Sequence, residues 1–141
     1  MQALNQLLQR HPVVFFHLAT ASAALLLGGW ILSQAKGTPR HRLLGWAWAL
    51  LMASTAVTAA FIRDYHLPNL FGFTPIHGFV LLVAVQLPRG IWYVRQGNVL
   101  GHRQTMRKLY IGSCVVAGIF TLLPGRFLGT LLWKNMLGVM A

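Results

Sequence analysis

Residues 12–32 read PVVFFHLATASAALLLGGWIL, a run of 21 residues with no charged side chain and one histidine, His17. A helix needs about 20 apolar residues to cross the roughly 30 Å of hydrocarbon in a bilayer. The run therefore predicts a membrane-spanning helix. Ala21-Ser22-Ala23 resembles a signal-peptidase cleavage site, but we expect the segment to be retained as a membrane helix.

Outward from this run, uncharged apolar stretches recur along the chain. They cover Leu43–Ile62, Leu67–Leu87, which Pro88-Arg89 closes, and Leu109–Pro124. We expect helices at about 12–33, 41–62, 69–94 and 102–124, with an interfacial helix in the tail at 127–141. Short connections then predict one all-α membrane domain over 1–141, a four-transmembrane-helix bundle with up-down-up-down topology.

The composition excludes a soluble globular domain. Charged residues make up 9% of the 141 residues, whereas soluble domains carry about 25%. Asp64 is the one acid beside 12 Lys and Arg, which rules out paired-carboxylate glycosidase sites, two-metal carboxylate sites and acidic proton relays. The single Cys114 excludes an internal disulfide. Because the basic residues lie between apolar runs, the net charge of +11 indicates membrane topology and no nucleic-acid partner.

The basic residues also predict an orientation. The connections after the first and third helices hold eight of them: Lys36, Arg40, Arg42, Arg89, Arg95, Arg103, Arg107 and Lys108. The other side holds four: Arg10, Arg63, Arg126 and Lys134. Cytoplasmic loops carry the excess of Lys and Arg. We therefore expect both termini outside, in the periplasm, of a multi-pass protein of the bacterial inner membrane.

Four of the six histidines form a repeated pattern. His17 and His77 each lie near the outer end of a predicted helix, and His41-Arg42 and His102-Arg103 lie at the cytoplasmic starts of the other two. The interval is 24 residues from His17 to His41 and 25 from His77 to His102. The other two histidines, His11 and His66, are expected in water at the outer surface, where Tyr65-His66 is a weaker candidate for bordering a substrate site.

In such a bundle, the first and third helices face each other diagonally, as do the second and fourth. His17 would then oppose His77 near the outer leaflet, and His41 would oppose His102 near the inner one. Opposed imidazoles across a bundle core can be the axial ligands of a haem iron. The pattern therefore predicts two haem b groups, separated in depth by about 20–25 Å.

Neighbouring residues suit this hypothesis but also have structural explanations. Arg42, Arg103, Arg107 and Lys108 are candidate partners for the propionates of the inner haem, and Arg63 for those of the outer one, although basic residues first determine topology. A stripe of small residues, Ala21, Ala24 and Gly28, is equally suited to a flat ring or to helix packing. Thr20, Ser22, Thr74 and Thr105 are candidates to hydrogen-bond the second nitrogen of a ligating histidine. The tryptophans mostly lie near span ends, as in an aromatic belt.

The boxes His17-Leu18-Ala19-Thr20-Ala21-Ser22, His41-Arg42-Leu43-Leu44-Gly45, His77-Gly78 and His102-Arg103-x-x-Met106 resemble a family of bacterial predicted membrane proteins. That family is classed as a domain of unknown function and has four helices with these boxes. The resemblance extends from about Pro12 to Pro124. The arrangement is also similar to that of transmembrane di-haem b-type cytochromes, a likeness that implies ligand roles for the four histidines.

We therefore hypothesise a di-haem b-type cytochrome that carries electrons across the inner membrane, an oxidoreductase acting by electron transfer alone if it is an enzyme. Expected partners are membrane lipid and a quinone, superoxide or a respiratory complex. Association of the chain into a homo-oligomer is a further expectation. One alternative is a haem-free protein that binds copper or zinc at His17 and His77. Another is a structural or assembly subunit of a larger membrane complex. A transporter fits less well, because Pro88 and Pro124 lie near span ends.

Overall fold

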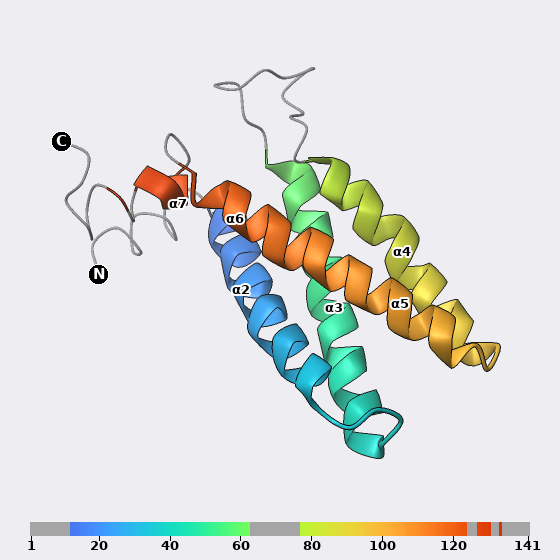
Figure 1. Cartoon of the computed structure of the whole chain (residues 1–141). Coiled ribbons are helices and arrows are strands. Elements are labelled where there is room, and N and C mark those ends of the chain that lie inside the picture. The colour runs from blue at the N-terminus through green and yellow to red at the C-terminus, as the bar shows by residue number, and fades with distance from the viewer. Residues whose placement is uncertain (1–11, 63–76, 124–126, 131–132, 134–141) are drawn as a thin grey trace.

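The computed structural model describes residues 12–62, 77–123, 127–130 and 133, and every element in these residues is helical. The elements are α2 (Pro12–Ser33), α3 (Pro39–Phe61), α4 (Gly78–Arg95), α5 (Val99–Tyr110), the π-helical turn η2 (Ile111–Val116), α6 (Ala117–Thr121) and the short α7 (Phe127–Thr130). The α5, η2 and α6 segments follow one another without a break and form one rod (Figure 1). The prediction of an all-α fold is confirmed.

Capping hydrogen bonds explain where the helices that flank the first basic loop end and begin. The Lys36 ammonium donates to the carbonyls of Ile31 and Leu32, at 3.0 and 2.7 Å, and so covers the end of α2. The Thr38 hydroxyl accepts from the His41 amide at 3.1 Å. With Pro39 as its first residue, α3 therefore begins two residues before the expected position.

The second basic loop is built in a similar way. Gly97 adopts a φ of 74°, which favours glycine, and the Asn98 side chain accepts from the amide of Gly101 at 2.8 Å. The rod α5–η2–α6 consequently begins at Val99, earlier than the expected residue 102. Pro88 does not end α4, which continues to Arg95. The expected start of this helix, at 69, lies outside the described residues, as does most of the tail at 127–141.

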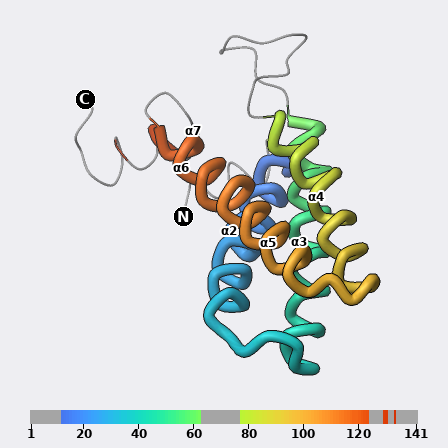
Figure 2. Tube along the Cα trace, turned by 45° about the vertical axis from the view of Figure 1, so that its right-hand side comes forward, coloured from blue at the N-terminus to red at the C-terminus, as the bar shows by residue number. Residues whose placement is uncertain are grey.

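The rods pack in a ring (Figures 1 and 2). Helix α2 packs on α3, α3 on α4, and α4 on α5, while the start of the last rod returns to α2 through α5 and η2. Consecutive rods run in opposite directions. In this order α2 lies diagonally from α4, and α3 lies diagonally from α5. The starts of α3 and α5 consequently lie at the same end of the bundle.

The core is narrow and the outer surface is apolar. The most buried side chains include Ala24 and Leu109, both at 0% exposure, and Met52 at 2%. Large apolar side chains such as Leu26, Leu43 and Phe61 are instead more than 70% exposed. By length and composition, α2 and α3 are each able to cross a membrane. An apolar exterior of this kind is expected for helices surrounded by lipid rather than water.

Candidate haem-binding site at the basic end

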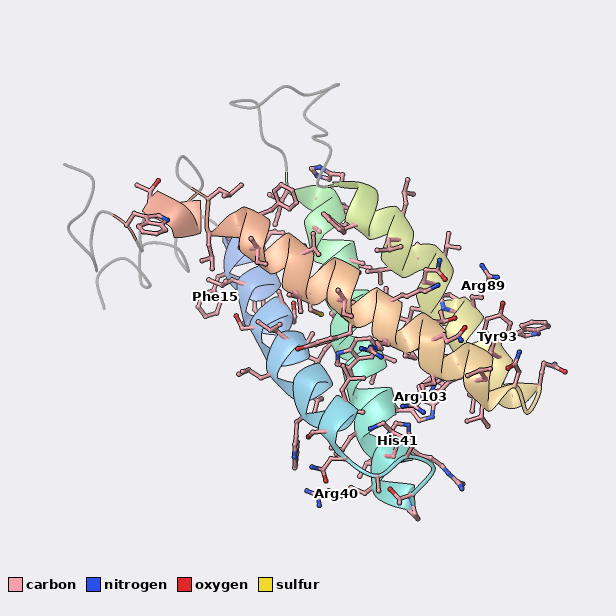
Figure 3. All side chains as sticks on the ribbon, viewed as in Figure 1. Phe15, Arg40, His41, Arg89, Tyr93 and Arg103 are labelled. Atoms are coloured by element: carbon pink, nitrogen blue, oxygen red, sulfur yellow. The ribbon has the colours of Figure 1, made fainter. Side chains whose placement is uncertain are left out.

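We call the end of the bundle that carries the two basic loops, residues 33–42 and 89–108, the basic end. It brings His41 and His102 together. His41 is the third residue of α3 and His102 the fourth residue of α5, so the capped starts of both helices place them at one level. Their ring centres lie 6.5 Å apart, and the ring planes are inclined by 87°. Figure 3 shows His41 at this end of α3, with Arg103 reaching towards it from α5.

A hydrogen bond sets the tautomer of His102. Its Nδ1 lies 2.8 Å from the carbonyl oxygen of Gly90 in α4. A carbonyl oxygen only accepts, so Nδ1 carries the proton and the lone pair of the neutral ring is on Nε2. Metal-ligating histidines use the same arrangement, in which one nitrogen donates to a carbonyl and the other binds the metal.

His41 supplies an observation of another kind. Its Nδ1 is buried and has no hydrogen-bond partner. Buried polar atoms are almost always paired, because an unpaired one costs roughly 1–3 kcal/mol. The described residues therefore leave one buried ring nitrogen of His41 without a partner, close to a second imidazole.

The separation of the two rings also fits a shared metal ion. A metal–nitrogen bond is about 2.0–2.1 Å, and the nitrogen lies about 1.1 Å from the centre of its ring, so two imidazoles on opposite sides of one ion have centres about 6.3 Å apart. The observed 6.5 Å is close to this value. Perpendicular ring planes are compatible with it, because each ligand can rotate about its own metal–nitrogen bond.

Positive charge surrounds the pair. The candidate propionate partners Arg42, Arg103, Arg107 and Lys108 are all exposed and unpaired in the described part of the chain. Arg40 differs, because its guanidinium carbon lies 4.8 Å from the centre of the Trp30 ring. Beside His41 is a hollow of about 200 Å³, lined by Ile31, Gln34, Ala35, Thr38, Arg40, His41 and Leu44. This end of the bundle can therefore accept an anionic group next to the two imidazoles.

The outer histidines lie near the other end of α3. The Nδ1 of His17 is 3.0 Å from the Thr55 carbonyl and 3.2 Å from the Thr58 hydroxyl oxygen. The Thr58 hydroxyl donates to the carbonyls of Ser54 and Thr55, at 2.8 and 3.0 Å, so its oxygen is left to accept from His17. The proton of His17 is therefore on Nδ1 and its lone pair on Nε2, as in His102.

His77 has the opposite tautomer. Its Nε2 lies 2.9 Å from the Ile62 carbonyl at the end of α3, so Nε2 carries the proton and the lone pair of the neutral ring is on Nδ1. Within the described ranges, the rings of His17 and His77 are not in contact, unlike those of His41 and His102. His11, Arg63, Asp64, His66 and Thr74 lie outside the described residues.

The stripe of small residues serves helix packing. A Cβ added to Gly28 would lie 2.6 Å from the indole nitrogen of Trp48 and 2.6 Å from Cδ2 of Tyr110. That indole nitrogen donates to the Ala24 carbonyl at 3.0 Å, and the Tyr110 hydroxyl donates to Leu25 at 3.1 Å. The flat rings on the stripe are thus aromatic side chains of this chain. Trp48, at 6% exposure, belongs to the core and not to an aromatic belt.

Several residues around the histidines were not predicted from the sequence. Thr55 and Thr58 hold His17, whereas the candidate Thr20 donates to the Phe16 and His17 carbonyls of its own helix. Gly90 holds His102 through its carbonyl, a contact that no side-chain pattern can indicate. The three-residue spacing of the two threonines, which places them on one helix face, was an available signal.

Comparisons with known proteins identify a family and nothing beyond it. A family model described as "Predicted membrane protein (DUF2306)" matches residues 14–135. Neither the curated proteins nor the solved structures contain a significant match. In the ranges that the structure describes, no group of three or more His, Cys, Asp or Glu is arranged to hold a metal ion.

Proposed function

We propose, from the premise that this chain belongs to the DUF2306 family of predicted membrane proteins, that it is a haem b cytochrome of the bacterial inner membrane. The observation that carries the proposal is the His41–His102 pair, two imidazoles in ring contact whose centres are 6.5 Å apart, a separation suited to one metal ion between them. The described residues supply no third ligand to this pair, which favours haem over a bare ion, because a zinc site requires three or four protein ligands. Haem supplies the remaining equatorial ligands itself and, when bound, provides one-electron transfer.

The proposal places four helices across the membrane with both termini in the periplasm. Two helices of the described chain meet the length and hydropathy requirements. The alternating direction of the rods and the eight basic residues of the two loops support the remaining topology. The His41–His102 end is then cytoplasmic.

The inner haem would be held by His41 and His102. His102 is oriented by the Gly90 carbonyl, which also raises the basicity of its second nitrogen. The exposed cations Arg42, Arg103, Arg107 and Lys108 would neutralise the propionates.

The outer haem would be held by His17 and His77. His17 already has the hydrogen bonds of a ligating histidine. His77 would exchange its contact with the Ile62 carbonyl for the iron. Two haems at these depths would carry electrons between a quinone, superoxide or respiratory-complex partner and an acceptor on the other face.

The deciding experiment measures haem content and the reduced-minus-oxidised absorption spectrum of the protein purified in detergent. We expect sharp b-type bands and two haems per chain in the pyridine haemochrome assay. Replacing His41, His102, His17 or His77 individually by Ala should remove one haem in each case. His66→Ala is the matched control and should retain both. A folded, colourless protein, or two haems in all four variants, would overturn the proposal.

A further inference from the structure

We propose that the groove between α3 and α4 at the basic end is a binding site for one anionic membrane phospholipid. This inference rests on the membrane topology proposed above but not on haem. The groove has a volume of about 350 Å³ and is lined by Trp46, Leu87, Pro88, Ile91, Trp92 and Arg95. Its occupant would lay an acyl chain along the apolar wall and its phosphate on the Arg95 guanidinium.

The walls favour a hydrocarbon chain. Five of the six lining side chains are apolar or aromatic, and the indoles of Trp46 and Trp92 are 52% and 56% exposed. The groove opens on the outer surface of the bundle, where neighbouring apolar side chains such as Leu50 and Val85 are also exposed. A segment of lipid can therefore enter it from the side, whereas a polar solute would leave its hydrogen-bonding groups unpaired.

Arg95 supplies the site's only charge. It is the last residue of α4, is exposed, and has no hydrogen-bond partner or ion pair in the described part of the chain. Arg89, one and a half turns earlier, is already engaged, because its Nε donates to the Tyr93 hydroxyl at 2.9 Å. The unengaged guanidinium thus lies at the loop end of the apolar wall. A phospholipid has the same arrangement, with its charged headgroup at one end of its apolar chain.

Charge complementarity selects an anionic lipid over a zwitterionic one. The two loops of this end carry eight Lys and Arg, and their described residues, 33–42 and 89–108, contain no acid. A single basic residue close to an anionic headgroup contributes about a fivefold preference for it, and in this groove that residue is Arg95. A zwitterionic headgroup would place its own cation beside Arg95 and forfeit this preference.

The test is native mass spectrometry of the full-length protein in a mild detergent. The probes are phosphatidylglycerol and phosphatidylcholine with identical acyl chains. We expect one tightly bound phosphatidylglycerol, held at least about fivefold more strongly than phosphatidylcholine. Arg95→Gln should abolish that preference. Arg40→Gln removes the same charge from the same end, where the Trp30 ring already engages Arg40, and should leave the preference unchanged.

A second pair of variants tests the apolar wall. Trp92→Ala should weaken the binding of both lipids severalfold, whereas Trp30→Ala, a partly exposed tryptophan of α2 outside the groove, should not. Equal losses in Arg95→Gln and Arg40→Gln would show diffuse surface attraction and overturn the site. Displacement of phosphatidylglycerol by ubiquinone, with binding insensitive to Arg95→Gln, would identify a quinone groove and also overturn it. The haem spectrum is recorded for the same variants. Loss of the lipid preference with an unchanged haem spectrum concerns the groove alone, whereas a colourless unmodified protein concerns the cytochrome proposal alone.

Discussion

The basic end and the opposite end of the bundle each contain two histidines, but the structure prepares them differently. At the basic end, the rings of His41 and His102 are in contact with their centres 6.5 Å apart, and a buried nitrogen of His41 has no partner among the described residues. At the opposite end, a carbonyl of α3 holds His17 and the carbonyl of Ile62, just after α3, holds His77, with protons on different ring nitrogens. Equal spacing in a sequence therefore does not produce equal sites, because the tautomer of each histidine depends on the nearest carbonyl.

The difference between the two histidine pairs predicts the order in which the two ends bind haem. When haem-free protein receives one equivalent of haem, the basic end should fill first, with an affinity at least about tenfold higher than that of the opposite end. The spectrum of this half-loaded protein should match that of His77→Ala. A match to His102→Ala would reverse the order of the two sites.

Gly28 tests the packing that both ends share. Gly28→Ala places a methyl group 2.6 Å from both Trp48 and Tyr110, so we expect destabilisation by about 1–3 kcal/mol and weaker haem retention at both ends. Thermal unfolding followed by circular dichroism measures it. The control is Gly118→Ala, where a Cβ would meet nothing within 4 Å, and the melting temperature should hold or rise. Loss of haem at one end alone would mean that the ends are not coupled through this contact.

Gly90 provides a test of the basic end alone. A Cβ there would overlap the terminal methyl of Met106, in a buried position whose carbonyl orients His102. We expect Gly90→Ala to weaken haem binding at this end by about tenfold, within the range known for residues that orient metal ligands, and to leave the opposite end unchanged. The double variant with Met106→Ala should recover most of the affinity. If it does not, the effect of Gly90→Ala does not arise from that overlap.

Thr58 provides the smallest effect, at the opposite end. Thr58→Val removes the hydroxyl that accepts from His17, while the Thr55 carbonyl remains as a partner. A change of a fewfold in outer-haem affinity is expected, because one of two acceptors is retained. Thr58→Ser keeps the hydroxyl and should behave as the unmodified protein in the same titration. An equal change at both ends would contradict a local role.

The all-α fold was predictable from the uncharged runs. A chain with one acid and 56% hydrophobic residues is expected in a membrane, where helices are the main way to pair every backbone N–H and C=O group. The histidine spacing indicated that His41 and His102 lie at the starts of diagonally opposed rods, at one end of the bundle. Their separation, and the binding of His77 to Ile62, depend on how helices rotate and where α3 ends. Those quantities come from packing. The place of Trp48 in the core likewise depends on Gly28, 20 residues away in sequence.

The π-helical turn at Ile111–Val116 has a consequence for how such a chain can change over time. A π-helical turn takes about one residue more than an α-helical turn, so the residues after Val116 are rotated by about 100° relative to an unbroken α-helix. Insertion or deletion of one residue here would turn α6 about its axis and leave the face of α5 that carries His102 where it is. In the fourth rod, a change of length at this turn can therefore alter which side chains α6 presents at one end of the bundle, while the position of His102 at the other end stays the same.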